Sequence, residues 1–179
     1  MSLKILSLIL KENLIYGLHF EGSRRMDQID LNMIKLLQLD GRMTISELSK
    51  KLALSRPSVA ERLKRLQEKG IIDGFYAHVP PEAVGRKLLV MIELSSLQVS
   101  LDEFEKMISD EPDVLECHKA TGHVHYYIKA ALNGTEELTH LIEKLIPFGS
   151  TRTSILLGSP VNRRVILPVS ETEGLPNRF

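Results

Sequence analysis

The stretch LSRPSVAERLKRLQEKGII, residues 54–72, decides the fold of the first half of the chain. Ser55 is a preferred helix N-cap, and Pro57 follows in the first turn, where a missing amide costs little. Gly70 ends the helical pattern. Between these ends, apolar side chains recur at helical spacing, at Val59, Leu63 and Leu66. The pattern predicts a helix over residues 55–69 that buries one side.

Two shorter helices are predicted before this one. Residues 27–38 repeat apolar positions at helical spacing, and Asp27 is suited to cap them. The sequence TISE, from Thr44, is a capping box that opens the second helix. After the third helix, Asp73-Gly74 lies between β-type residues and predicts a hairpin. Three short helices and a hairpin predict a winged helix-turn-helix domain over residues 26–79.

The pattern changes after Pro80-Pro81, which opens a predicted linker over residues 80–86. Strands are predicted at residues 87–96, 113–121, 124–132 and 153–158, and helices at residues 101–110 and 134–146. The order βαββαβ predicts a ferredoxin-like sandwich over residues 87–168. Its two helices cover one face of the sheet, so the other face needs solvent or a partner. The predicted fold class is therefore α+β, with two different domains.

The length suits one large domain or two small ones, and the composition is ordinary for a globular protein. The chain has 179 residues, of which 43% are hydrophobic and 26% charged, and its formal net charge is zero. The total charge therefore points neither to nucleic acid nor to a membrane surface. Cys117 is the only cysteine, which excludes an intrachain disulfide and fits a reducing, cytoplasmic setting. The charge is uneven, because residues 27–79 hold 9 basic and 7 acidic side chains, whereas residues 80–179 hold 10 and 14.

The two ends of the chain lie outside the predicted domains. The apolar run LKILSLIL near the N-terminus is too short to span a membrane and lacks a clear cleavage site. Residues 1–25 are therefore either an appendage or an extra helix or strand packed on the body of the protein, and both interpretations stay open. Residues 169–179 form a tail. No membrane partner is expected.

The exposed side of the third predicted helix is basic. Residues 55–69 contain two acidic side chains and five basic ones, at Arg56, Arg62, Lys64, Arg65 and Lys69. Because a recognition helix enters the major groove with its N-terminus first, Ser55, Arg56 and Ser58 are expected closest to bases or phosphates. Arg62 and Arg65 lie farther along and are expected to meet phosphates. The alternative is a solvated basic face, but the helix order and the hairpin signal favour DNA binding.

Two sets of motifs, one in each predicted domain, resemble those of a known protein family. The first set is D-x-x-D-x-x-[IL]-[IL] at 27–34, D-G-R at 40–42 and L-S-x-x-x-[VA]-x-x-R-[LV]-x-x-L-[EQ]-x-x-G-[IV]-I at 54–72. The second set is VLECHKATG at 114–122 and TRTSILL at 151–157. In this order they resemble the Lrp/AsnC family, the feast/famine transcription regulators. The resemblance covers about residues 26–168.

The resemblance implies a DNA-binding domain joined to a small-molecule-sensing domain. It implies dimers that form through the open sheet face, and further assembly, commonly to octamers. The implied partners are double-stranded DNA, an amino-acid effector and other copies of the chain, with no cofactor, metal or catalytic residue. The implied DNA contacts are Thr44, Ser55, Arg56, Ser58, Arg62 and Arg65. The implied effector residues are Thr121, Gly122, His123, Val124, His125, Thr151 and Thr153.

One position departs from the family pattern. The family usually has T-G-x-x-D-[YL], whereas residues 121–126 read TGHVHY, with His125 at the acidic position. A neutral histidine accepts a hydrogen bond but brings no negative charge for an amino group. An effector is therefore expected to differ from an ordinary amino acid or to bind more weakly. The open alternatives are a loop without a ligand and a metal site built from His118, His123, His125 and Glu116.

Two other classes of function stay open. The same two-domain layout resembles the sirohaem decarboxylases, enzymes that use histidines near their ligand site. The other alternative is an oligomeric sensor that has lost DNA binding. The basic side chains of residues 55–69 argue against both, because neither needs them. A DNA-binding transcription regulator, and not an enzyme, is the leading prediction.

Overall fold

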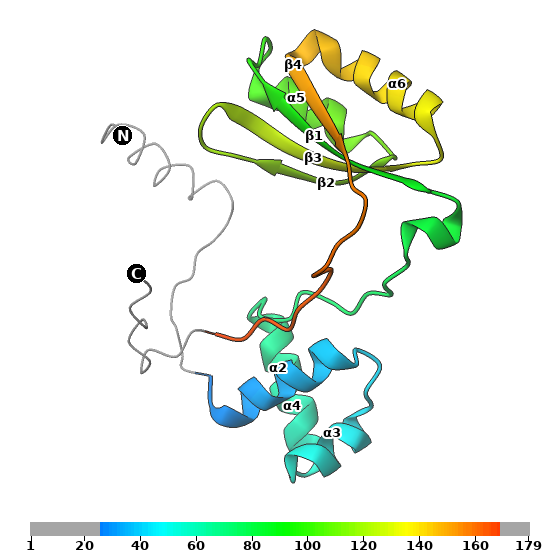
Figure 1. Ribbon diagram of the computed structural model, residues 1–179. Coiled ribbons are helices and arrows are strands. Elements are labelled where there is room, and N and C mark those ends of the chain that lie inside the picture. Colours follow the sequence, from blue (N-terminus) through cyan, green and yellow to red (C-terminus); the bar gives the residue numbers. More distant parts are fainter. Residues whose placement is uncertain (1–25, 169–179) are drawn as a thin grey trace, which may run out of the picture. The chain divides into compact units, whose positions relative to one another are not determined.

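The computed structural model describes residues 26–168, which form two compact units (Figure 1). The first unit contains residues 26–76 and 164–168, and the second contains residues 77–163. Residues 164–168 were predicted in the second domain but lie with the first unit. The predictions for residues 1–25 and 169–179 lie outside the described residues. Between residues 26 and 168, no helix is long and apolar enough to cross a membrane.

Three capped helices build the first unit, as the sequence predicts. They are α2 (Gln28–Leu39), α3 (Ile45–Leu52) and α4 (Arg56–Glu68). At each N-terminus a side-chain oxygen accepts a backbone N–H that has no partner inside the helix. Asp27 caps α2, the capping box of Thr44 and Glu47 opens α3, and Ser55 caps α4.

The apolar sides of the three helices form one core. Its buried side chains are Met33, Ile34, Leu37, Leu48, Val59 and Leu66. Partly buried side chains extend it, including Leu63 from the predicted stripe of α4. Burial of this side of α4 fixes which of its faces is turned outward. The side of α4 opposite this core, which includes Glu61 and Lys64, is exposed.

The prediction of a hairpin at Asp73-Gly74 is wrong, because residues 71–79 form no strand. The N–H groups of Ile71 and Ile72 instead donate to the Leu66 carbonyl, at 3.0 and 3.2 Å. The first limb of the expected hairpin is therefore used to close the end of α4. An isolated two-stranded hairpin is also only marginally stable. A short 3-10 helix, η1 (Pro81–Val84), follows within the predicted linker.

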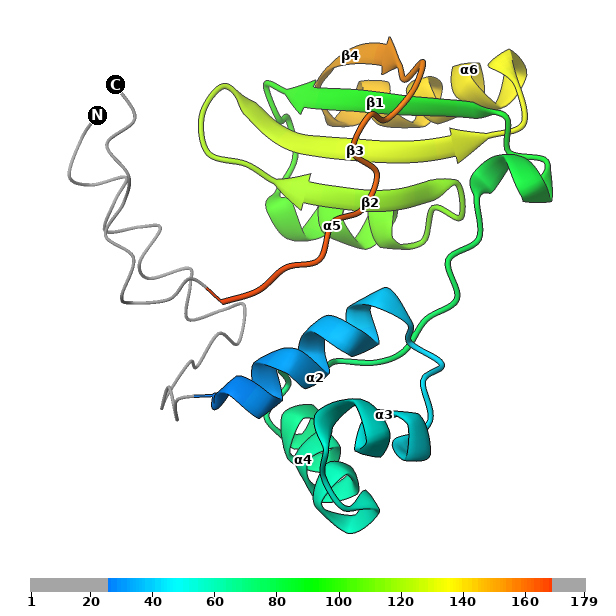
Figure 2. The same ribbon diagram turned by 60° about the horizontal axis from the view of Figure 1, so that its bottom comes forward.

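The second unit has the predicted split βαβ topology. Its strands are β1 (Leu88–Ser95), β2 (Val114–Lys119), β3 (Val124–Leu132) and β4 (Ser150–Ile155). All pairs are antiparallel, and the order across the sheet is β2-β3-β1-β4. Helices α5 (Leu101–Ser109) and α6 (Thr135–Leu145) lie behind the sheet in Figure 2. The ferredoxin-like prediction is confirmed.

The last strand begins three residues earlier than predicted. The apolar run at residues 155–157 suggested a strand over residues 153–158, whereas pairing with β1 already starts at Ser150. β4 is an edge strand with one neighbour, so polar side chains along it remain solvated. Gly149 lets it begin there, because a Cβ at this position would lie 2.5 Å from the Ser95 carbonyl oxygen. Leu157, expected in the strand, is 97% exposed.

Alternate residues of the sheet face opposite sides. One face is buried against α5 and α6 by Val90, Ile92, Leu94, Tyr126, Ile128 and Ala130. The residues between them form the open face, which we define by Leu89, Met91, Glu93, Tyr127, Lys129, Ala131 and Arg152. This face mixes apolar and charged side chains and has no helix over it (Figure 2).

Candidate DNA interface and sensing loop

The amino end of α4 gathers three of the predicted DNA contacts. The Ser55 hydroxyl accepts the Ser58 N–H at 3.3 Å and lies 2.9 Å from the Ser58 hydroxyl. Arg56 is exposed, and among residues 26–168 it forms no ion pair. The helix end therefore presents one unpaired guanidinium, two hydroxyls and the positive end of the helix dipole. Such a surface suits a phosphate or a base edge.

Thr44 is exposed but its side chain is engaged in the cap of α3. Its hydroxyl donates to a Glu47 carboxylate oxygen at 2.7 Å and accepts the Glu47 N–H at 3.2 Å. The Thr44 N–H donates to the same carboxylate at 2.7 Å. The backbone and then the hydroxyl of Thr44 lower the pKa of Glu47, because both stabilise its charged form. Thr44 therefore fixes the start of α3.

Arg62 and Arg65 are turned toward α2 by ion pairs. Arg62 Nη1 donates to Asp27 Oδ2 at 2.6 Å and to Asp30 Oδ1 at 2.8 Å. Arg65 Nη2 lies 3.1 and 3.0 Å from the two carboxylate oxygens of Asp30. Asp30 is 5% exposed. Helical periodicity alone predicts both arginines as phosphate contacts and does not reveal these partners.

The pKa shifts in this cluster follow from its hydrogen bonds. The Asp30 N–H, followed by the Arg62 guanidinium, lowers the pKa of Asp27. Hydrogen bonds to Asp27 and then to Asp30 raise the pKa of Arg62. Both shifts favour the charged form of each group, so the cluster is an ion-paired network at neutral pH.

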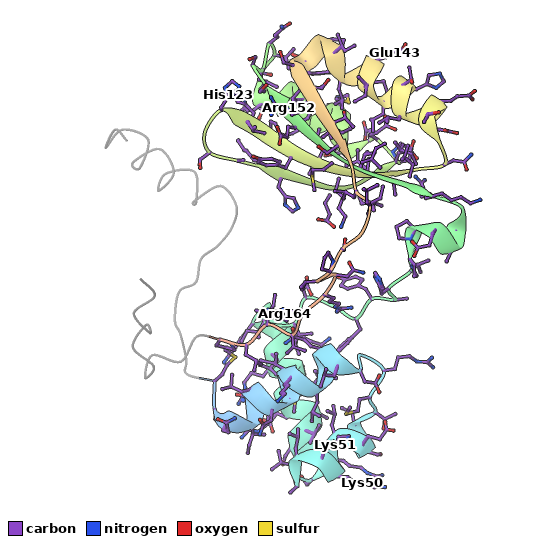
Figure 3. The ribbon with its side chains drawn as sticks, viewed as in Figure 1. Lys50, Lys51, His123, Glu143, Arg152 and Arg164 are labelled. Carbon is purple, nitrogen blue, oxygen red and sulfur yellow. The ribbon has the colours of Figure 1, made fainter. Side chains whose placement is uncertain are left out.

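Two further cations project from α3 near its connection to α4. Lys50 and Lys51 are exposed and occupy the last turn of α3 (Figure 3). Within the described chain neither is paired with a carboxylate, whereas Lys64 on α4 lies 3.5 Å from Glu68. The first helix of a helix-turn-helix crosses the DNA backbone, where lysines meet phosphates. Their place just before the turn, in SKKL, was a sequence signal that the prediction did not use.

The predicted sensing loop joins β2 to β3. Thr121, Gly122 and His123 are exposed, and Figure 3 shows His123 on this loop. The Ala120 N–H donates to the His125 carbonyl at 2.8 Å and closes the loop. Gly122 has a positive φ of 117°. Such backbone conformations favour glycine.

His125 follows the loop at an irregularity of the β1–β3 pairing. Tyr126 is paired with Leu94, but Ser95 is paired with Val124, so His125 is skipped. Its Nδ1 atom is buried without a hydrogen-bond partner in the described chain. A buried ring nitrogen of this kind is suited to a ligand or a water molecule.

The remaining predicted effector residues lie at the same end of the sheet. Thr151 is paired with Leu94 and Thr153 with Ile92, both on β1. Because β1 separates β4 from β3, this places Thr151 roughly 10 Å from the backbone of β3. Both threonines share the helix-covered side with Leu94 and Ile92. A single chain therefore brings the two parts of the predicted site to one end of the sheet, with β1 between them.

The metal alternative has no supporting geometry in residues 26–168, where no three His, Cys, Asp or Glu side chains are grouped to hold an ion. Glu116 instead lies 3.2 Å from His118 Nε2 and 2.8 Å from Lys129 Nζ. Cys117 is an unsuited thiolate ligand, because burial, and then the charge of Glu105, raises its pKa to about 11.

Comparisons with known proteins agree with both halves of this geometry. A profile described as winged helix-turn-helix DNA-binding matches residues 26–73, and one described as Lrp/AsnC ligand binding domain matches residues 87–166. The HTH-type transcriptional regulator LrpC of Bacillus subtilis is 30% identical over 132 residues, which are 74% of this chain and 92% of that protein.

Solved structures extend the similarity to the fold. The structure of B. subtilis LrpC matches with a TM-score of 0.74 and 29% identity, over 78% of this chain and 99% of that chain. The transcriptional regulator NMB0573 of Neisseria meningitidis, solved as an L-Met complex, matches with a TM-score of 0.74 and 26% identity, over 79% of this chain and 96% of that chain.

Proposed function

The chain belongs to the Lrp/AsnC family of DNA-binding transcription regulators, and from this premise we propose that α4 enters the major groove of its operator DNA. The observation that carries this proposal is the exposed amino end of α4, with Ser55, Arg56 and Ser58, on a helix that the core holds from behind. Arg56 is long enough to reach a guanine edge, and the two serines suit phosphates or bases.

Phosphate contacts are proposed for the cations on either side of the turn between α3 and α4. Lys50 and Lys51 are the free charges of α3, and Arg56 begins α4. Thr44 contributes through the cap that fixes α3 beside the DNA backbone. Because these contacts carry no sequence information, they set the position of the protein on the duplex. The cytoplasm, where such DNA is accessible, is the proposed compartment.

Selection of DNA from a random pool, followed by a gel shift, tests this proposal. The wild-type protein should retard a selected duplex, and Arg56→Gln should weaken the affinity for it by about fivefold or more, since a good base contact contributes about 1–3 kcal/mol. Lys106→Gln is the matched control, because Lys106 is an exposed cation of α5. Equal retardation of the duplex by the wild type and by Arg56→Gln would show that the amino end of α4 does not contact the DNA.

We propose that two chains pair through the open face of the sheet. This face presents the side chains of Leu89 and Met91 and the exposed ring of Tyr127 beside the charges of Glu93 and Lys129. A two-fold pair can bury the apolar strip and match opposite charges across the axis. Such a dimer presents two copies of α4 to two half-sites. Octamers are the further assembly proposed from the family.

The proposed effector is an amino acid or a related molecule that binds at the loop of residues 121–125. The relative solved with L-Met supports this class of ligand. The proposed contacts are the loop itself, including His123 and Val124, and Thr151 and Thr153 at the same end of the sheet. Because these residues are exposed or separated by β1, the proposed site is completed by another chain.

We propose no catalytic role for this chain, whose relatives are named as transcription regulators. The sirohaem decarboxylase alternative makes a distinct prediction, which is tetrapyrrole binding by the sensing domain. Absorbance spectra after mixing with a tetrapyrrole separate the two. A regulator leaves the pigment spectrum unchanged, whereas a new absorption band would support the enzyme.

A further inference from the structure

We infer that Arg62 and Arg65 are positioning residues, which set the angle of α4 through the buried carboxylate of Asp30 instead of binding phosphate. This inference rests on the proposed entry of α4 into DNA. Among the described residues, Asp30 is the one buried polar or charged side chain, at 5% exposure. It lies in the first turn of α2, opposite the middle of α4.

The two arginines reach Asp30 from successive turns of α4. Arg62 bonds one carboxylate oxygen of Asp30 at 2.8 Å, and it also bonds Asp27 at 2.6 Å. Arg65 contacts both oxygens of Asp30, at 3.1 and 3.0 Å. The cluster therefore joins the start of α2, including its cap residue, to two points along α4.

These contacts supply a constraint that the apolar core does not. Burial of Met33, Val59 and Leu66 holds α4 against its neighbours, but apolar attraction is non-directional. Hydrogen bonds between guanidinium and carboxylate groups have fixed distances and directions. Two of them, one helical turn apart, resist both sliding and rotation of α4 on α2. The base contacts at Arg56 depend on that orientation.

A transfer of Arg62 to a phosphate is unfavourable. It would leave the carboxylate of Asp30 buried with fewer partners, which is costly in a poorly solvated site. Arg62 is also the less accessible of the pair, with 23% of its side chain exposed against 42% for Arg65. Lys50, Lys51 and Arg56 are exposed and form no ion pair with any residue from 26 to 168, so they offer phosphate contacts at no such cost.

The sign of one substitution separates the two roles. Asp30→Asn removes a negative charge near DNA, so simple electrostatics predicts tighter binding to any duplex. The positioning role predicts weaker binding to the specific site, because α4 loses its fixed angle. Arg62→Gln should have the same effect from the other side of the pair. Since both act on one contact, the double variant should be little worse than either single variant.

The test measures dissociation constants for a selected duplex and a scrambled duplex of equal length, over a range of salt. For both single variants we expect at least a tenfold loss on the selected duplex and less than a twofold change on the scrambled one. The slope of log affinity against log salt should stay as in the wild type. Lys51→Gln is the matched control, expected to weaken both duplexes and to reduce the slope by about 0.9.

Two results would overturn the inference. Equal losses on both duplexes, with the slope of Arg62→Gln reduced by about 0.9, would make Arg62 a phosphate ligand. A lower melting temperature without any change in either affinity would make the cluster merely structural. If Asp30→Asn does not fold, Arg62→Lys can replace it in the test. Its affinity for the selected duplex should fall less than that of Arg62→Gln. Failure of the wild type to bind either duplex would instead refute the proposed function, and this inference with it.

Discussion

At the scale of single residues, Asp27 links local and long-range structure. Its carboxylate accepts the Asp30 N–H at 2.9 Å, which starts α2, and also pairs with Arg62 on α4. Both partners favour the charged form, and they lower its pKa in the folded chain. The folded state therefore binds this proton less readily than the unfolded chain does, and that difference makes stability depend on pH.

The pH dependence of Asp27→Asn follows from this sign. Asparagine keeps the cap but not the charge, so the variant should melt at a lower temperature at pH 7. The contribution of Asp27 is present above the unfolded pKa, about 3.9, and is lost as pH falls below it. The melting temperatures of the wild type and of Asp27→Asn should therefore converge as the pH is lowered from 7 to 3. A difference that grows toward acid pH would contradict this assignment.

His125 gives a second prediction at this scale. If the absence of a carboxylate at this position weakens binding of an amino group, His125→Asp should restore that interaction. Addition of millimolar L-Met should then raise the melting temperature of the variant more than that of the wild type, because ligands stabilise the state they bind. His123→Asp, a neighbouring exposed position, is the control. Equal shifts in all three proteins would leave this loop without an effector role.

At the scale of elements, the loop between β2 and β3 depends on its glycine. Gly122 has a φ of 117°, yet a Cβ there would meet no atom within 4 Å. The cost of Gly122→Ala is therefore backbone strain, of about 1 kcal/mol or more, and not a clash. The melting temperature should fall by roughly 4–8 °C per kcal/mol. Gly158→Ala, without a positive φ, should be neutral, and equal effects of both would refute the strain argument.

Capping and periodicity were sufficient to predict the elements that depend on nearby residues. Asp27, Thr44 and Ser55 start three helices where the sequence predicts them, because a cap acts within four residues. The hairpin after α4 could not be predicted reliably, because the same residues have a competing partner in the Leu66 carbonyl. The start of β4 depends on the close approach of Gly149 to β1, which no local pattern reveals.

In the candidate site too, features that depend on nearby residues could be predicted, whereas those that depend on distant residues could not. The amino end of α4 follows from its cap and apolar stripe, so the position of Arg56 and Ser58 at this end could be predicted from sequence. The pairing of Arg62 with Asp30 spans 32 residues, and helical projection alone makes such an arginine look solvent-facing. Long-range ion pairs of this kind need the packing of α2 on α4 before they can be seen.

At the scale of the whole molecule, the chain connects its two units twice. Residues 77–87 leave the first unit for β1, and the chain after β4 returns to the first unit. There, the Gln38 side-chain amide bonds the backbone of Ile166 twice, at 2.8 and 2.9 Å. The proposed sensing loop therefore has two covalent connections to the helices that are proposed to bind DNA.

Assembly is the prediction that belongs to this scale. Met91 lies on the central strand β1 within the open face, between Lys129 and Ser154. Met91→Glu should place a charge in the interface between chains and shift the protein to monomers in sedimentation experiments. Lys106→Glu, on α5, should sediment as the wild type does. Unchanged assembly of Met91→Glu would show that the open face is not the interface.

The most direct measurement of the central claim is the affinity of the wild-type protein for a selected duplex and a scrambled duplex across a salt series. A DNA-reading α4 predicts binding of the selected duplex at least about 10³-fold tighter than the scrambled one at physiological salt. Log affinity should fall linearly with log salt on both duplexes. Equal affinity for the two, or binding that does not depend on salt, would contradict the account.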